Sequence, residues 1–473
     1  MVVHGLKARW VFPVAGEPLR DGVVWIEGDR IAAIGEGGRA AGARDLGDVA
    51  ILPGLVNAHA HLELGGFSQP IGRPGIPFVE WLRGVTASRR SGRYDAVAAV
   101  RRGLAESSAA GVAALAEIAQ PGWPEQLFRQ AADRSSAAAR IDATVFLELI
   151  GPTAERAAEA LRLAARHIDQ GQRAGAWRPA LSPHAPYSAG AELVERACRL
   201  SAERHFPVAM HLAESREELQ LLETGRGPLR AFLESLGAWA DRADRRRRPR
   251  DYLEMLAAAD RALVVHGNYL ARDEIAFLAS RRETMTVVYC PRTHAWFQHT
   301  AYPLEALLAA GVSVALGTDS RASSPNLNLL EDVRCAIQRH PSVPKSKILE
   351  LATLGGARAL GLEAELGTLE PGKRADVVIW SANPFSIYAR ADQVFIDGAL
   401  TYDRNDPAYQ PRSDFELGQP GSPALCSSSS YMTAKRSKAT TPKCIAPQAG
   451  SSRRISRTGR SASDGASPSS GAR

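Results

Sequence analysis

Two histidines stand two residues apart in the segment Val56-Asn57-Ala58-His59-Ala60-His61. On a β-strand, residues i and i+2 point to the same face, so both imidazoles can reach one metal ion. The pair alone is a weak indication, because two ordinary polar histidines can have the same spacing. Its weight depends on what the rest of the chain brings to the same place.

Further metal-ligating residues follow other strand-like runs of the chain. They are His184 in LSPHAPYS, His211 in VAMHLAES, His266 in LVVHGNY and Asp319 in ALGTDS. In a barrel of parallel strands the carboxyl ends meet at one rim. Imidazole nitrogens with one carboxylate suit zinc and leave a position open for water. The sequence therefore predicts one Zn²⁺ per chain, with Fe²⁺ as the alternative, held by His59, His61, His211 and Asp319.

Such a site still needs groups that move protons. Glu214 stands three residues after His211, and we expect it to act as general acid and base. The alternative is an acid that merely favours a helix N-terminus. Asp319 is expected to ligate the metal and to accept the proton of the attacking water. None of the seven lysines lies on a strand candidate of the barrel, which excludes a binuclear site bridged by a carbamylated lysine.

The elements that would position these residues can be counted. Eight strand-like runs, most followed by a helical pattern, lie between residues 51 and 364: AILPGLVNAHAHLE, GVAALAEIA, ATVFLELIG, RPALSPHAPYS, PVAMHLAES, ALVVHGN, MTVVYCPRT and VSVALGTDS. Repeated strand–helix units predict an α/β fold, a (β/α)₈ TIM-type barrel. Residues 1–50 and 365–410 read as short strands and turns. We expect both chain ends to form one small β-sandwich.

Composition separates the end of the chain from its body. The net charge is +7, but the residues from Gly418 onward carry nine Lys/Arg and one acid. The rest is nearly neutral, so nucleic-acid binding by the body is not expected. The Ser/Arg-rich residues 411–473 predict a disordered tail. A nucleic-acid or membrane tether is the alternative for this tail.

The cellular location of the protein and its partners are predicted from features that the sequence lacks. The sequence has no run of about 18 apolar residues, and its start has no pattern of a secretory signal. Five scattered cysteines without a CxxC pair suit a reducing compartment. We therefore expect a cytoplasmic enzyme that makes no contact with membranes and acts on a small molecule, with a homodimer as a possible assembly.

The motifs PGLVNAHAHLEL, SPHAPYS, HLAES, VVHGNYL, ALGTDSRASSPN and GTLEPGKRADVVIW together resemble the amidohydrolase superfamily, in its mononuclear branch of deaminases and chlorohydrolases. The resemblance implies the four metal ligands named above and a proton shuttle at Glu214. It also implies that His266 polarises the group under attack and that His184 contacts a purine.

A finer resemblance concerns His61-Leu62-Glu63-Leu64 and the segment FVEWL, residues 78–82. Both are similar to the aminodeoxyfutalosine deaminases of menaquinone synthesis, and this implies substrate contacts by Glu80 and Trp81. The alternative is an ordinary amphipathic helix start. The expected reaction is hydrolytic deamination of a purine nucleoside-like substrate.

Rival functions stay open. Within the enzyme class they are deamination of adenosine, S-adenosylhomocysteine, methylthioadenosine or guanine, and dechlorination of a triazine-like ring. Glu214 favours an amine as the leaving group, because chloride needs no proton. A catalytically silent metal-binding scaffold is a more distant alternative.

Overall fold

The computed structural model describes residues 3–36, 42–91, 95–132, 141–239 and 247–406. The predicted disorder of residues 411–473 and the possible tether concern a segment outside the described residues. Among the described residues, no helix is long and apolar enough to cross a membrane.

Eight parallel strands form the first sheet, in the order of the chain. They are β6 (Leu55–Ala60), β7 (Val112–Ala119), β8 (Asp142–Leu149), β9 (Arg178–Pro183), β10 (Pro207–Leu212), β11 (Arg261–His266), β12 (Met285–Tyr289) and β13 (Ser313–Leu316). A parallel bridge between Ala60 and Asp319 brings the first and last strands together. All eight predicted strand runs are present, so the predicted barrel is confirmed.

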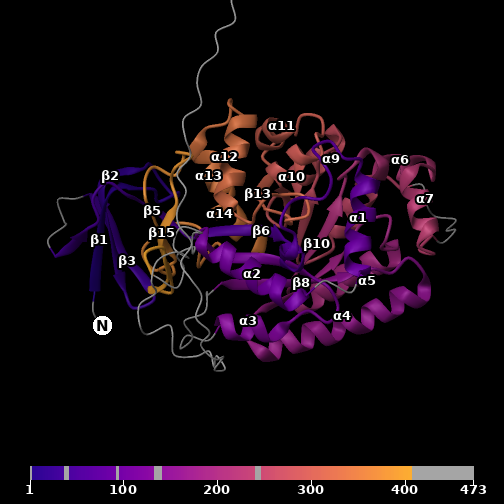
Figure 1. Ribbon diagram of the computed structural model, residues 1–473, viewed down its shortest axis with the longest axis horizontal. Coiled ribbons are helices and arrows are strands. Elements are labelled where there is room, and N and C mark those ends of the chain that lie inside the picture. Colours follow the sequence, from indigo (N-terminus) through magenta and orange to yellow (C-terminus); the bar gives the residue numbers. More distant parts are fainter. Residues whose placement is uncertain (1–2, 37–41, 92–94, 133–140, 240–246, 407–473) are drawn as a thin grey trace, which may run out of the picture. The chain divides into compact units, whose positions relative to one another are not determined.

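Helices follow most strands and surround the barrel (Figure 1). They are η2 (Leu62–Gly66), α1 (Phe78–Arg90), α2 (Ala96–Ala109), α3 (Glu125–Ala132), α4 (Ala154–Ala174), α5 (Ala191–Arg204), α6 (Arg216–Thr224), α7 (Pro228–Ser235), α8 (Pro249–Leu256), α9 (Arg272–Ser280), α10 (Pro291–Trp296), α11 (Leu304–Ala309), α12 (Leu329–Arg339), α13 (Lys345–Leu351) and α14 (Leu354–Leu360). Local chemistry sets their ends. The Thr153 side chain caps the start of α4, and Gly175, in a left-handed conformation, ends it.

Small and branched side chains fill the barrel interior. Val56 and Ala58 of β6, Phe146 of β8 and Val265 of β11 belong to one buried cluster. This packed layer separates the two ends of the barrel. Polar side chains on the interior therefore gather above it, at the carboxyl ends of the strands.

Both ends of the chain build the second sheet, as predicted. It contains β1 (Val3–Val11), β2 (Leu19–Glu27), β3 (Arg30–Glu36), β4 (Ala43–Asp45), β5 (Ala50–Pro53), β14 (Val377–Trp380), β15 (Ala391–Ile396) and β16 (Ala399–Asp403). The strands form one continuous mixed sheet in the order β16-β15-β14-β5-β1-β2-β3, with β4 beside β1. Figure 1 shows the orange late strands beside the indigo early ones.

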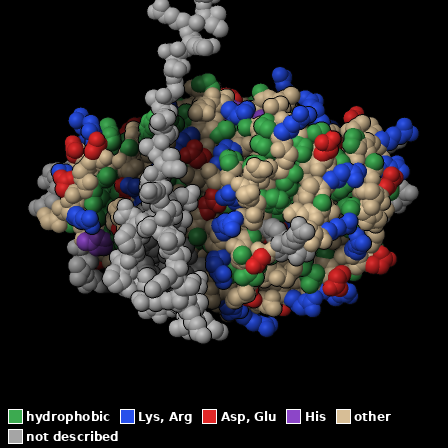
Figure 2. All heavy atoms as spheres, viewed as in Figure 1, with side chains coloured by type: hydrophobic (Ala, Val, Ile, Leu, Met, Phe, Trp, Pro, Cys, Tyr) green, Lys and Arg blue, Asp and Glu red, His purple; other side chains and the backbone are tan. Residues whose placement is uncertain are grey.

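The two sheets are joined at Gly54, which alone separates β5 from β6. The run AILPGLVNAHAHLE is thus divided, since its first four residues pair with β1 and β14 rather than with the barrel. On the face seen in Figure 2, basic and acidic side chains are interspersed rather than gathered by sign. Three described cysteines, Cys198, Cys290 and Cys335, are free thiols.

Candidate active site

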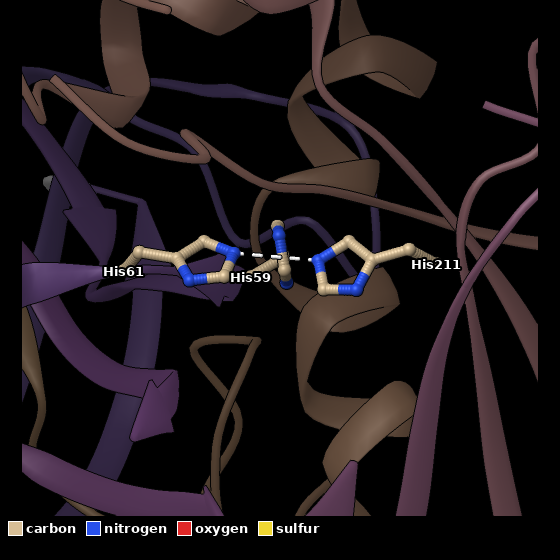
Figure 3. A group of neighbouring side chains, drawn as sticks. All are labelled: His59, His61 and His211. Carbon is tan, nitrogen blue, oxygen red and sulfur yellow. Dashed lines mark hydrogen bonds between the residues drawn. The ribbon is translucent and has the colours of Figure 1, made fainter. Parts of the chain in front are cut away.

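Three of the predicted metal ligands converge at the barrel mouth. One nitrogen each of His59, His61 and His211 lies within 4.8 Å of the others, and all three residues are buried. The Nε2 atoms of His61 and His211 are 3.3 Å apart and point toward each other, with the His59 ring beside them (Figure 3). The predicted His-x-His pair therefore does share one site with the histidine of β10.

Asp319, the fourth predicted ligand, lies against the same cluster. Its Oδ1 atom is 3.8 Å from Nε2 of His59 and 3.8 Å from Nε2 of His61. Its Oδ2 atom accepts a hydrogen bond from the Ser323 hydroxyl at 3.0 Å. One oxygen is thus held by the protein, and the other faces the imidazoles.

The chemistry of this donor set fits a metal ion. Both ring nitrogens of His59 and Nδ1 of His61 are buried without a hydrogen-bond partner, an unfavourable state for polar atoms unless they ligate an ion. His211 donates from Nδ1 to the His184 carbonyl oxygen at 2.9 Å, which leaves Nε2 free to ligate. Burial lowers the pKa of His211 to about 4 and that of His59 well below its usual value, so both imidazoles are neutral ligands.

Barrel closure positions the ligands of β6 against the segment after β13. The backbone amides of Thr318 and Asp319 both donate to the His59 carbonyl oxygen at 3.1 Å. The buried Asn57 side chain accepts from the Thr318 amide and donates to its hydroxyl. A Cβ atom on Gly317 would lie 2.8 Å from Cβ of His59, so this approach requires glycine.

Glu214 lies beside His266, with 3.4 Å between its Oε1 and the histidine Nε2. A tight turn places it there, since Ala213 and His266 both have left-handed backbones, with φ of 53° and 70°. Glu218 holds this turn by accepting hydrogen bonds from the amides of Ala213 and Glu214 at 3.0 and 2.8 Å. Asn268 donates to the Glu214 carbonyl oxygen.

Burial shifts the pKa values of two acids at the barrel mouth, Glu214 and Asp319. It raises the pKa of Glu214 well above its usual value, and the negative charges of Asp319 and Glu218 add to the effect. Burial also raises the pKa of Asp319 to about 7, although the Ser323 hydroxyl opposes the shift. Asp319 can therefore hold or release a proton near neutral pH, and burial favours the protonated form of Glu214.

His184 occupies the other side of the mouth. Its Nδ1 is 2.6 Å from the Ser188 hydroxyl, and its Nε2 is 3.7 Å from Oε1 of Glu148. The buried Glu148 also accepts a hydrogen bond from the Gln120 amide. His184, Glu148 and His211 form a second group of close ligand-type atoms.

The two substrate residues predicted on α1, Trp81 and Glu80, differ in burial. Trp81 is buried, packs against Phe78 and Phe297, and donates its indole N–H to the Ala322 carbonyl oxygen at 2.8 Å. It therefore supports the loop after Asp319. Glu80 is exposed, and within the described part of the chain it forms no hydrogen bond or ion pair with the histidines.

The arginines of the same helix are engaged. Arg89 forms a short ion pair with Glu63, and Arg83 lies over the Phe232 ring.

Four acids and amides of the site were not predicted: Gln120, Glu148, Glu117 and Glu218. Both carboxylate oxygens of Glu117 accept from the single N–H of Leu62, next to His61. A polar residue within an apolar strand, as in VAALAEIA and VFLELIG, is the signal that could have identified two of them.

A closed barrel with a histidine-rich metal site at its mouth defines a class of hydrolase. The amidohydrolase family profile matches residues 50–401, and the chain belongs to this family. A 5-methylthioadenosine/S-adenosylhomocysteine deaminase of Moorella thermoacetica is 30% identical over 391 residues, which are 79% of this chain and 84% of the relative. An aminodeoxyfutalosine deaminase of Deinococcus radiodurans is 29% identical over 357 residues, 72% and 81% of the two chains.

Among solved structures, an adenosine deaminase of Xanthomonas campestris with bound zinc is similar, with 26% identity and a TM-score of 0.65. The match covers 84% of this chain and 92% of that one. The predicted family and enzyme class are thereby confirmed.

Proposed function

We propose that this protein is a metal-dependent hydrolytic deaminase of an adenine-type nucleoside. The observation that carries the proposal is the convergence of four metal-ligand side chains with the Glu214–His266 pair at one barrel mouth. Deaminases of adenine nucleosides among the relatives support the same substrate class.

The ion would be held by His59, His61, His211 and Asp319. The zinc bound in the similar adenosine deaminase supports this assignment. When bound, Zn²⁺ polarises water and so makes it nucleophilic at neutral pH. Burial favours the protonated form of Glu214, which would donate its proton to the ring nitrogen beside the carbon under attack. Asp319 accepts a proton from the water, and His266 orients the water from the other side. The C–O bond forms and the C–N bond breaks. Asp319 passes its proton to the departing amine, which leaves as ammonia, and the second proton of the water restores Glu214.

Aminodeoxyfutalosine is the substrate that we put first, which would place the enzyme in menaquinone synthesis. The segments HLEL and FVEWL and the Deinococcus relative support it. Methylthioadenosine and S-adenosylhomocysteine are the second candidates, because the Moorella relative has nearly the same identity. We also propose that the enzyme acts in the cytoplasm.

Absorbance-monitored deamination by the zinc-loaded protein tests both levels. We expect conversion of adenine to hypoxanthine chromophore, fastest with aminodeoxyfutalosine, and loss of the reaction in Glu214→Gln. A faster reaction with methylthioadenosine would reassign the substrate within the same chemistry. No change with any adenine nucleoside would refute the proposal.

A further inference from the structure

The short helix that follows the predicted metal ligand His61 is not capped by that residue. η2 begins at Leu62, and within the described part of the chain His61 occupies the N-cap position without a side-chain hydrogen bond to the helix. The first backbone amides of a helix have no partner inside it, and an N-cap side chain commonly accepts from them. The His61 imidazole is instead directed toward His211 (Figure 3). The acceptor for these amides must therefore come from another element.

Glu117 of the neighbouring strand β7 supplies that acceptor. Its two carboxylate oxygens lie 3.0 and 2.9 Å from the Leu62 amide nitrogen. Burial raises the pKa of Glu117 well above its usual value, and hydrogen bonds from the backbone amides of Leu62 and Glu63 oppose this shift. The next amide, that of Leu64, donates to the His61 carbonyl oxygen at 3.1 Å. Glu117 thus caps the first turn of η2 from outside the segment.

Strand pairing places Glu117 beside the end of β6. It is paired with Ala60, the residue before His61, in the parallel register of β6 and β7. The register shifts between Asn57 and Ala60, because the pairs Asn57–Leu115 and Ala60–Glu117 are three residues apart on β6 and two residues apart on β7. An extra residue of this kind bends a strand and changes the direction of its side chains. The conformation of the segment that carries the histidine pair therefore depends on contacts beyond the strand ladder.

Glu117 faces away from the reacting groups. Ala116 and Ile118, on either side of it, belong to the interior layer of the barrel, so Glu117 points outward, toward the surrounding helices. It is 2% exposed. An acid buried on this apolar side is destabilising unless its oxygens accept hydrogen bonds. The hydrogen bonds to the start of η2 satisfy it, and through them Glu117 acts on the site without contact with a substrate.

We propose that Glu117 is a positioning residue of the metal site, which holds the backbone after His61 and thereby directs the His61 imidazole. This inference rests on the metal site of the proposed function and deepens it. Without this acceptor the amides of Leu62 and Glu63 need other partners, because buried amides are rarely left unpaired. The backbone that carries His61 would then move with them. Partners that orient a metal ligand contribute about 10- to 100-fold to metal affinity.

The zinc affinity of the folded protein tests this role. In competition titrations against a chelator, Glu117→Met, which has no oxygen to accept a hydrogen bond, should bind zinc about 10- to 100-fold more weakly than the wild type. Glu117→Gln keeps one acceptor oxygen and should stay within about threefold of the wild type. The visible absorption of the cobalt-substituted protein, which reports the ligand geometry, should change in Glu117→Met alone. Unchanged zinc affinity in Glu117→Met, or equal losses in the two variants, would overturn the inference.

Glu274 offers a matched control, because it too is a buried acid that accepts from backbone amides at a helix start. It is 4% exposed and accepts from the amides of Ala271 and Arg250 at 2.7 and 3.1 Å. Glu274→Met should lower the stability of the metal-free protein and leave its zinc affinity unchanged. A loss of zinc affinity equal to that of Glu117→Met would mean that both acids act through folding alone, and would overturn the inference. If Glu117→Met does not fold, Glu117→Ala removes the acceptor without adding apolar atoms and should weaken zinc binding as well.

Deamination assays on the same samples separate this inference from the proposed function. Zinc affinities in the expected order, in a protein that deaminates no adenine nucleoside, would support the positioning role and refute the proposed reaction. Deamination by the wild type together with unchanged zinc affinity in Glu117→Met would overturn the positioning role alone. A wild-type protein that binds no zinc would overturn both.

Discussion

The backbone amide of Asp319 donates a hydrogen bond to the carbonyl oxygen of His59, with the two atoms 3.1 Å apart. A main-chain hydrogen bond therefore joins two predicted metal ligands that come from opposite ends of the barrel sequence. The amide of His61 in turn lies 3.4 Å from the Asp319 carbonyl oxygen. The hydrogen bonds that close the barrel therefore also hold these predicted ligands side by side.

Gly317 permits this closure, so Gly317→Ala should destabilise the protein. The added methyl group would lie 2.8 Å from Cβ of His59 and 3.0 Å from its carbonyl oxygen. We expect the free energy of unfolding to fall by about 1–3 kcal/mol in denaturant titrations. Gly16→Ala is the matched control, because a Cβ there meets no atom within 4 Å. Equal stability of the two variants would contradict the closure argument.

The histidine cluster predicts one zinc ion per chain. Elemental analysis should find one equivalent, and removal by a chelator should lower the unfolding temperature, because ligation stabilises only the folded state. His59→Ala should bind zinc at least 100-fold more weakly in a competition titration. The exposed His205→Ala serves as control. Wild-type affinity in His59→Ala would refute the assignment of this ligand.

Glu214→Gln should lower kcat by about 10²- to 10⁴-fold, the usual contribution of a general acid or base. Zinc content should not change, since Glu214 is not among the ligands. Glu223→Gln, at an exposed position of the following helix, should behave as wild type. A variant that loses zinc together with activity would mean that Glu214 serves the metal rather than the proton.

Glu218 is a positioning residue, because it holds the turn that carries Glu214. Glu218→Ala should reduce kcat by about 10- to 100-fold, and Glu218→Gln, which keeps one acceptor oxygen, should reduce it less. Steady-state kinetics with zinc analysis checks this order. Identical losses in the two variants would argue against hydrogen bonding to the turn.

The buried His167 should make the folded protein less stable in mild acid. Burial lowers its pKa from 6.5 to about 4, while Nε2 bonds to the Val145 carbonyl oxygen. The unfolded state then binds the proton more readily, so stability is present above pH 6.5 and is lost as the pH falls toward 4. Between pH 7 and pH 5 the loss from this group is about 2 kcal/mol.

Denaturant titrations at these two pH values should show a smaller pH dependence in His167→Gln than in the wild type. The exposed His205→Gln should keep the wild-type dependence. An unchanged pH dependence in His167→Gln would show that other groups cause the acid sensitivity.

The sequence predicted what depends on local periodicity. Eight apolar runs followed by helical patterns predicted the barrel, and strand-end residues such as His211 predicted the metal cluster. The pairing of β5 with β14 was not resolved, because AILP reads continuously into the barrel strand and only Gly54 marks the change of sheet. Such pairing depends on residues more than 300 positions away in the sequence.

Several site residues escaped prediction for a related reason. Glu117 and Glu148 matter through what they meet in space, a backbone amide after His61 and the rings of the mouth. No regular spacing in the sequence encodes these contacts. Trp81 has a contact of the same kind, since its indole bonds to the Ala322 carbonyl oxygen, while its predicted contact with substrate stays a prediction.

The barrel strands contribute unequally to the site, which has a consequence for how such an enzyme can change over evolutionary time. Strands β7 and β8 contribute none of the predicted metal ligands and neither member of the Glu214–His266 pair. Gln120 and Glu148, at the ends of these strands, can therefore be substituted without removing a predicted ligand or a member of that pair. Selection and laboratory evolution can thus change two neighbouring strands while the predicted ligands and the Glu214–His266 pair are inherited unchanged.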